Sequence, residues 1–357
     1  MLHTFLRRGA TAAEPDEMVD LGVRGGDREL IARMAATIMD ALRPLVVPGT
    51  PCAVLDFPSY ANVGDSLIWL GQREALRRLG ARVVYMCDMD TYAAGYMRMR
   101  LGDGLILLTG GGNFGDLWAH HQRFRERVVA DFPHHRIIQL PQTVYFMDER
   151  TAARTRAVLA GHRDFTMLVR DPGSQAYARD VLGVRAVLCP DVVFMLGPVR
   201  RPAPPREDVL VLARQDAEVR SPLGRLAAHG VTVTDWATDD RTPIRQTHVA
   251  LTRCVIHYPR ALPAVGAMLW RTYDPLARQR MERGARLLAR GRVVITDRLH
   301  GHLLCVLMGI PHVLLPNSYA KNRAYYDAWT RSSPLATWAD EPEQAIALAR
   351  GMLAAAS

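Results

Sequence analysis

Lysine is almost absent from this chain, and long apolar runs are missing. Lys321 is the only lysine among 357 residues, so arginine carries almost all of the positive charge behind the net charge of +9. No apolar stretch approaches the roughly 20 residues that a membrane-spanning helix requires. Residues 1–18 lack the long hydrophobic core of a signal peptide. We therefore expect a cytoplasmic protein.

Patterns typical of metal and nucleic-acid binding are also missing. The five cysteines are scattered without C-x-x-C spacing, which favours buried reduced thiols over disulfides or a metal site. The histidine pairs 120–121 and 134–135 lack the spacing of metal ligands. No basic run is interleaved with aromatic residues, so we do not expect a nucleic-acid partner. The positive balance instead suggests anionic ligands, an acidic polymer, or peripheral contact with the inner face of a membrane.

Buried strand-like segments alternate with helical segments along the chain. This alternation predicts an α/β fold with parallel, doubly wound sheets. We expect the segment 136–146 to begin as a strand and to end in a loop at Pro141. The expected strands cover residues 52–57, 82–88, 105–109, 136–146, 165–171, 186–194, 208–216, 231–236, 254–258, 292–297 and 312–316.

The length of the chain predicts two domains, and residues 197–208 are the best linker between them. That segment carries four prolines and five charged residues without apolar periodicity. We expect a Rossmann-like domain over residues 1–200, a second over 201–335, and a C-terminal helix within 336–357. Packing of that helix back on the first domain is one option. Two such domains would face each other across a cleft.

The stretch LILLTGGGNFGDLW (105–118) contains a literal G-x-G-x-x-G, formed by Gly110, Gly112 and Gly115. A dinucleotide-binding turn would need an acidic residue about 20 positions further on, at the end of the next strand. Asp131 lies at that distance but precedes the strand. At least two strands also come before the glycines, whereas the fingerprint usually follows the first strand. A dinucleotide site is therefore disfavoured, and we expect a tight turn between a strand and a helix.

The pattern N-x-G-D occurs twice, at Asn62–Asp65 and at Asn113–Asp116, each time after a buried strand. Asparagine tolerates left-handed backbone, glycine needs no space for a Cβ, and aspartate caps helices. Two ordinary turns between a strand and a helix are one interpretation. If both turns face the cleft, their amides and carboxylates would bind or deprotonate an acceptor hydroxyl.

Residues 292–329 carry the densest set of chemically active side chains. A buried strand ends at Asp297, Arg298 and His300, and Gly301 then opens a helix. An arginine, a histidine and a free helix N-terminus together would bind an anion beside a titratable group. A core histidine next to a surface arginine is the alternative.

The segment TDRLHGHLLCVLMGIPHVLLPNSYAKN resembles the C-terminal signature of the polysaccharide pyruvyl transferases. ANVGD, GGGNFGD, LPQT (140–143), VRDPGS (169–174) and CPDVVF (189–194) match that family in order, so the resemblance spans about residues 52–329. It implies an enzyme with two Rossmann-like domains, similar to the glycosyltransferase-B fold. It also implies phosphoenolpyruvate as the donor, a sugar diol of an exopolysaccharide, capsule or cell-wall precursor as the acceptor, and no cofactor. A lipid-linked acceptor is one option.

The donor would need several fixed cations, because phosphoenolpyruvate carries both a carboxylate and a phosphate. The resemblance implies that His300 is essential and that Arg298 binds the donor, and Leu299 is placed with them. His300 is also the best general acid for the methylene carbon. Further donor-binding candidates are Lys321, Arg214 and Arg170. The alternatives are an exposed loop lysine at 321 and pairing of the two arginines with Asp216 and Asp171.

The acceptor side is predicted from the glycine turns and their neighbours. Asp65 and Asp116 are the candidate catalytic carboxylates. The predicted acceptor-binding residues are Asn62, Asn113, Gly112, His120 and Gln142. Aromatic residues that either stack on sugar rings or pack in the core are Trp69, Trp118, Tyr145 and Trp329. Two other functions stay open, namely a glycosyltransferase that uses a nucleotide sugar and a non-catalytic glycan-binding protein.

Overall fold

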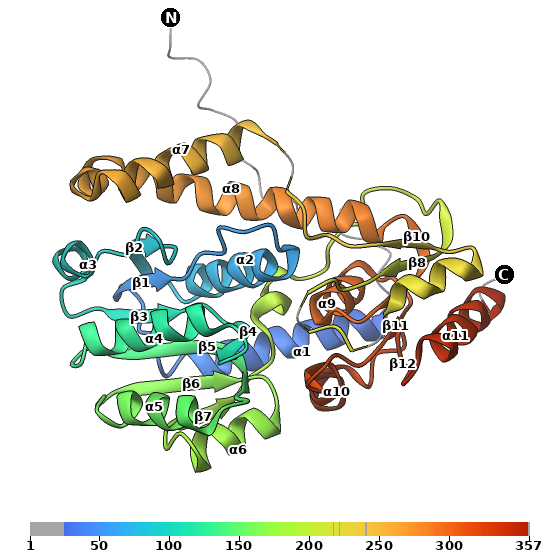
Figure 1. Cartoon of the computed structure of the whole chain (residues 1–357), viewed down its shortest axis with the longest axis horizontal. Helices are drawn as coiled ribbons and strands as arrows, with labels where there is room; N and C mark the ends of the chain where they lie inside the picture. The colour runs from blue at the N-terminus through green and yellow to red at the C-terminus, as the bar shows by residue number, and fades with distance from the viewer. Residues whose placement is uncertain (1–24, 217, 221, 240, 356–357) are drawn as a thin grey trace, which may run out of the picture.

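A computed structural model describes residues 25–355 except 217, 221 and 240. Within these residues the chain forms two parallel sheets (Figure 1). The first sheet has the strand order β2-β1-β3-β5-β6-β7, with β4 paired to β5. Its strands are β1 (Pro51–Leu55), β2 (Arg82–Cys87), β3 (Leu105–Leu108), β4 (Gly111–Gly115), β5 (Ile137–Tyr145), β6 (Phe165–Val169) and β7 (Arg185–Leu188).

The second sheet follows in the chain and has the order β12-β11-β10-β8-β9. Its strands are β8 (Glu207–Leu212), β9 (Thr232–Thr234), β10 (Gly291–Thr296), β11 (His312–Leu314) and β12 (Ala336–Trp338). The central strands of both sheets are buried apolar runs, as expected where helices cover both faces. The predicted α/β fold with two parallel sheets is confirmed, and the sheets fall on either side of residue 200.

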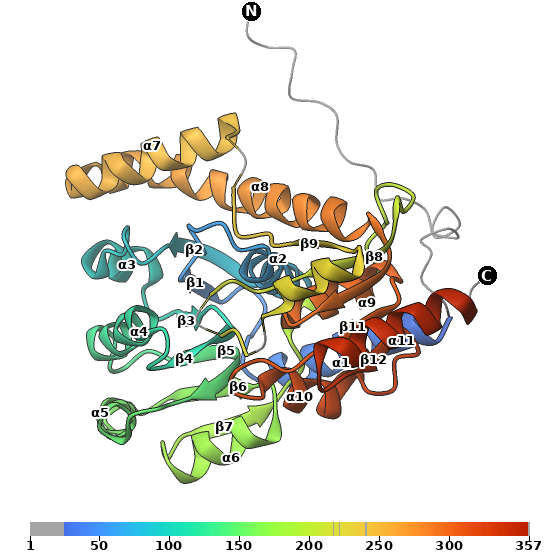
Figure 2. The same ribbon diagram turned by 45° about the vertical axis from the view of Figure 1, so that its right-hand side comes forward.

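Helices surround both sheets (Figures 1 and 2). The α-helices are α1 (Gly25–Leu42), α2 (Val63–Arg78), α3 (Ala94–Leu101), α4 (Ala119–Asp131), α5 (Glu149–Ala160), α6 (Pro172–Asp180), α7 (Pro243–His257), α8 (Leu262–Leu288), α9 (Leu299–Met308), α10 (Lys321–Tyr325) and α11 (Pro342–Ala355). Shorter helical turns are η2 (Val192–Leu196), η3 (Leu223–His229), η4 (Pro259–Ala261) and η5 (Tyr326–Thr330). None of the described helices is long and apolar enough to cross a membrane.

The helices α7 and α8 belong to the second half of the chain. Helix α8 packs on α2 of the first half, and α7 packs on α8 (Figure 2). The Tyr273 ring stacks on Phe57 with a centroid distance of 4.0 Å. Arg280 donates a 2.6 Å hydrogen bond to the Pro58 carbonyl oxygen. The expected strand at 254–258 is wrong, because these residues end α7. A short apolar run fits the buried face of a helix as well as it fits a strand.

Other elements also differ from their sequence-based prediction. The expected strand 186–194 ends at Leu188 as β7, and Val192–Leu196 form the helical turn η2. Strand β5 continues through Pro141 to Tyr145, and the register of its ladder with β6 shifts between Gln139 and Gln142. That irregularity accommodates a proline, which has no N–H to donate. Helix α11 does not return to the first sheet. Its Ile346 packs in the core of the second sheet with Val209 and Val313.

The glycine motif forms a strand rather than a turn that leads directly into a helix. Strand β4 pairs with β5 in parallel, with Gly111 opposite Gln142 and Gly115 opposite Tyr145. Gly115 has φ +128°, and a Cβ there would lie 1.7 Å from the Tyr145 carbonyl oxygen. The next helix begins only at Ala119. The motif therefore builds no phosphate-binding helix N-terminus.

Gly115→Ala is expected to destabilise the protein by at least ~2 kcal/mol, because the new Cβ meets backbone and the φ angle suits only glycine. Gly95→Ala in α3 is the matched control, since a Cβ there meets nothing within 4 Å. It should stabilise by roughly 0.5–1 kcal/mol. Urea unfolding midpoints measure both changes. Equal midpoints for Gly115→Ala and the wild type would contradict the close packing of Gly115 against the backbone of Tyr145.

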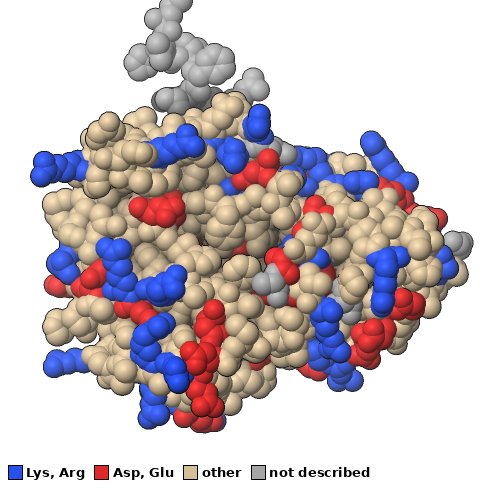
Figure 3. All heavy atoms as spheres, in the orientation of Figure 1, with Lys and Arg blue, Asp and Glu red and all other residues tan. Residues whose placement is uncertain are grey.

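Basic and acidic side chains are interspersed over the face shown in Figure 3. The excess of arginine is therefore spread across this face rather than gathered into one stripe. Many arginines are paired on the surface, for example Arg77 with Glu74 and Arg136 with Asp164. Net charge alone thus points to no single binding face.

Candidate active site

A cavity of about 310 Å³ lies between the two halves of the chain. Its volume is within the range of small-molecule sites. The first half contributes Tyr60, Ala61, Asn62, Asp65, Gly112, Asn113, Trp118, His120 and His121 to its wall. The second half contributes Arg214, Asp216, Glu218, Trp236, Ala237, Arg298, His300 and Lys321. Several of these residues follow the carboxyl ends of parallel strands, where α/β proteins bind ligands.

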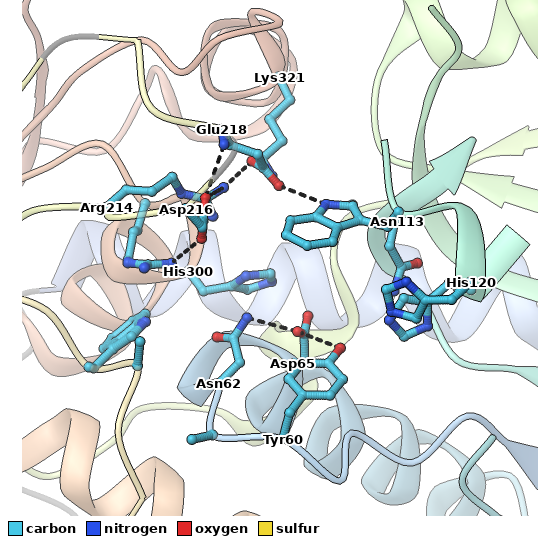
Figure 4. Close-up of a pocket in the computed structure, with 17 residues that line it drawn as sticks. Tyr60, Asn62, Asp65, Asn113, His120, Arg214, Asp216, Glu218, His300 and Lys321 are labelled. Carbon is cyan, nitrogen blue, oxygen red and sulfur yellow. Dashed lines mark hydrogen bonds and ion pairs between the residues drawn. The ribbon is translucent and has the colours of Figure 1, made fainter. Parts of the chain in front are cut away.

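The first N-x-G-D motif forms the start of α2 and one wall of the cavity (Figure 4). Asn62 caps the helix, with its Oδ1 accepting from the Gly64 amide at 2.9 Å. The Asn62 amide and the Tyr60 hydroxyl both donate to Oδ2 of Asp65, at 2.8 and 2.9 Å. A Cβ on Gly64 would lie 2.6 Å from the His300 ring. Glycine is therefore needed where α2 meets the second half of the chain.

His300 lies in the first turn of α9 and contacts a buried carboxylate. Its Nε2 is 3.3 Å from Oδ2 of Asp191, the same oxygen that Nη1 of Arg170 contacts at 2.5 Å. Burial raises the pKa of Asp191, but the hydrogen bond and charge of His300 and the charge of Arg170 outweigh burial and hold it well below its usual value. Asp191 therefore stays ionised and orients the imidazole in the cavity.

Arg170 lies behind the cavity wall, where it is not among the lining residues. Its side chain has no solvent exposure and contacts Asp191 and the Thr143 hydroxyl. It does not pair with Asp171, which instead caps α6 by accepting from the Ser174 amide at 2.7 Å. The structure thus gives Arg170 a role in holding Asp191 and does not bring it to the cavity.

Three more predicted residues lie outside the lining set. The Asp116 carboxylate accepts from the Met147 and Asp148 amides, at 2.8 and 2.7 Å, and so is turned away from Asp65. Gln142 is buried and donates at 2.9 Å to Oδ1 of Asn113, which it holds from behind. Leu299 is 2 % exposed and packs in the hydrophobic core.

The opposite wall gathers three cations with carboxylate partners (Figure 4). Lys321 and Arg214 both contact Glu218 closely. Burial lowers the pKa of Lys321 to about 8, although Glu218 opposes this shift. Burial raises the pKa of Glu218, but Lys321 and Arg214 outweigh it and lower the value to about 2. Lys321 is 6 % exposed, so the alternative of an exposed loop lysine is wrong.

Arg298 is held in place by a second carboxylate that sequence reasoning missed. Its Nε and Nη2 donate to the two oxygens of Asp235, both at 2.7 Å, while Nη1 lies 3.5 Å from Asp216. Arg214 also contacts Asp216 at 3.3 Å, the pairing that was the alternative to a donor-binding role. Both arginines nevertheless line the cavity.

Sequence reasoning also missed carboxylates that line the cavity or hold its lining residues in place. Asp191 and Asp235 each follow a strand closely, the signal that identified Asp297, whereas Glu218 lies in an irregular loop.

Of the four aromatic candidates, Trp118 lines the cavity and donates to Glu218 at 3.4 Å. The remaining three contact protein: Trp69 is buried in the core, Tyr145 stacks on Tyr319, and Trp329 donates to the Arg170 carbonyl oxygen. No described residues cluster as a three-ligand metal site.

The polysaccharide pyruvyl transferase family matches this chain over residues 62–319, so the chain belongs to that family. The match confirms the resemblance found in the sequence and places the protein among the transferases. Every cavity residue except Tyr60, Ala61 and Lys321 lies within the matched span.

Individual relatives agree with the family. Pyruvyl transferase 1 of Schizosaccharomyces pombe is 34% identical over 295 residues, covering 79% of this chain and 70% of that protein. EpsO of Bacillus subtilis, which carries the pyruvyl transferase name provisionally, is 32% identical over 282 residues, covering 78% and 85%. A Klebsiella pneumoniae crystal structure of uncharacterised function has a TM-score of 0.58 at 18% identity, over 86% of this chain and 99% of that one. This last similarity concerns the fold alone.

Inorganic phosphate is expected to bind less tightly as the pH rises through about 8, because the buried Lys321 loses its charge above that pKa. Between about pH 7 and about pH 9.5 the affinity should fall roughly tenfold, as measured by calorimetry. Lys321→Arg should remove this dependence, because a guanidinium stays charged throughout. An equal fall in affinity in both proteins would show that Lys321 does not contact the anion.

Proposed function

We propose that this enzyme transfers the pyruvyl group of phosphoenolpyruvate to two hydroxyls of a sugar in a polysaccharide or its precursor. The product is a cyclic pyruvate ketal, and phosphate is released. The observation that carries the proposal is the opposition of two walls in one cavity. Arg214, Arg298 and Lys321 lie on one wall, and the hydrogen-bonded Asn62 and Asp65 lie on the other.

The cationic wall suits a donor with two anionic groups. Charge-assisted hydrogen bonds to phosphate and carboxylate are strong, and arginine binds both in bidentate geometry. The Nε of Arg214 is buried and has no hydrogen-bond partner among the described residues. Glu218 and Asp216 now neutralise this wall, so the donor would compete with these carboxylates for the cations. Lys321 adds a compact charge suited to a phosphate oxygen.

His300 supplies the proton that the reaction needs. Ketal formation requires a proton on the methylene carbon while a hydroxyl oxygen attacks C2 of the donor. An imidazolium is stabilised by an ionised carboxylate, and Asp191 is held in that state 3.3 Å from His300. This pairing supports a general-acid role for His300 and gives Asp191 and Arg170 the role of positioning it.

The opposite wall suits a sugar. Asp65 accepts hydrogen bonds from Tyr60 and Asn62 and so presents a fixed carboxylate to a hydroxyl. Asn113, His120 and Trp118 line the cavity on the same side, and an aromatic ring there can stack on a sugar. A polysaccharide acceptor is also what the family name states.

Phosphate release from phosphoenolpyruvate, measured with a panel of sugar and oligosaccharide diols, tests the proposal directly. With at least one acceptor, the enzyme should release one phosphate for each product molecule formed, and the mass of that product should show one added pyruvate ketal. Turnover of a nucleotide sugar without any phosphate release from phosphoenolpyruvate would replace this function with glycosyl transfer. Saturable glycan binding without turnover of either donor would support a non-catalytic protein.

His300→Gln should lower kcat about 10²- to 10⁴-fold and change the affinity for phosphoenolpyruvate less than about threefold, since it removes the acid but leaves Arg214, Arg298 and Lys321 in place. Single-turnover assays and equilibrium binding separate the two effects. His229→Gln, on an exposed turn that does not line the cavity, is the control and should behave as the wild type. A kcat within tenfold of the wild type in His300→Gln would refute the general-acid role.

A further inference from the structure

A second histidine–carboxylate pair lies on the acceptor wall of the cavity. Oδ2 of Asp56 is 2.8 Å from Nδ1 of His121, and both side chains are 5% exposed. His121 lies in the first turn of α4 and lines the cavity, whereas Asp56 directly follows β1. His300 reaches the same cavity from α9, in the other half of the chain.

Asp56 is held in an unfavourable state. Its φ of +71° is one of two positive values at non-glycine residues in the described part of the chain. Its Oδ1 is buried without a hydrogen-bond partner. Strained backbone and an unsatisfied carboxylate oxygen each cost stability and are concentrated at functional sites. Arg125 is the buried cation nearby, but its guanidinium already donates to Gln139 and Asn113. His121 is therefore the partner for which Asp56 is placed.

We propose that Asp56 and His121 form the base that takes the proton from the attacking sugar hydroxyl. A carboxylate on Nδ1 fixes the tautomer that leaves Nε2 as a proton acceptor. Among the described residues, nothing donates to or accepts from Nε2 of His121, so it is free for a hydroxyl in the cavity. This inference rests on the proposed pyruvyl transfer and names the residue that performs its deprotonation step.

Proton transfers through the two histidines balance over the whole reaction. In the first half, the hydroxyl proton moves to His121, the hydroxyl oxygen bonds to C2, and His300 gives its proton to the methylene carbon. In the second half, the bond from C2 to the phosphate oxygen breaks, and the phosphate leaves with the proton from His121. The second hydroxyl oxygen then bonds to C2 and gives its proton to His300. Both histidines end as they began.

Neighbouring groups suit this step less well. His120 is more exposed and has no carboxylate partner among the described residues. Burial and the neighbouring His121 lower the pKa of His120, which weakens it as a base. Asp65 already accepts two hydrogen bonds at Oδ2, which suits it to hold a hydroxyl in position.

The first test measures phosphate release by His121→Gln with an acceptor that the wild type uses. We expect kcat to fall about 10²- to 10⁴-fold, with the KM for phosphoenolpyruvate within about threefold of wild type. His120→Gln is the contrasting variant and should raise the KM for the acceptor more than it lowers kcat. If the wild type releases no phosphate with any acceptor of the panel, the proposed function itself is refuted. An active wild type with kcat of His121→Gln within tenfold would overturn only the dyad.

The second test asks whether Asp56 acts through His121. Asp56→Asn removes the charge, and asparagine tolerates the same left-handed backbone, so the fold should be retained. We expect kcat to fall at least tenfold, and the double variant with His121→Gln to be no slower than His121→Gln alone. A purely structural role would make the two effects multiply, and that result would overturn the dyad. If Asp56→Asn does not fold, the His121→Gln comparison still decides the proposal.

Discussion

The buried carboxylate of Asp191 is the interaction on which the site depends. One oxygen faces Arg170 at 2.5 Å and His300 at 3.3 Å, and these residues come from opposite halves of the chain. An ionised carboxylate in the interior is stable only with such partners. Its backbone amide also donates to the Tyr325 hydroxyl of the second half. The same carboxylate therefore holds the two halves together and orients His300. Removing Asp191 would also leave the buried Arg170 without its counter-charge.

Glycines let the two halves approach this closely. A side chain at Gly64 would overlap the His300 ring, and a Cβ at Gly112 would lie 3.1 Å from Nζ of Lys321. The two glycine-rich motifs thus have different local structures. The first starts a helix beneath the histidine, while the second is a strand whose Gly112 carbonyl accepts from Tyr319 at 3.2 Å. Their shared role is to leave room for His300 and Lys321, which reach the cavity from the other half.

Much of this could be predicted from sequence, and the failures have physical reasons. The parallel sheets, His300, Arg298 and Lys321 were accessible because buried strands and the residues after them leave a local pattern. Glu218 was not, because it lies in an irregular loop and meets Lys321 across 103 positions. Asp191 meets His300 across 109 positions, so its role appears only once the halves are docked. Asp116 was predicted at the site because its motif repeats that of Asp65. The pairing of β4 with β5 instead turns its carboxylate toward backbone amides.

The central claim is that donor and acceptor occupy opposite walls of one cavity. A crystal structure of the chain with phosphoenolpyruvate, without acceptor, tests it most directly. The account predicts the phosphate and carboxylate of the donor within hydrogen-bond distance of Arg214, Arg298 and Lys321, with the methylene carbon toward His300 and the space beside His121 left open. A donor bound instead against Asn62, Asp65 and His121, or outside this cavity, would contradict the account.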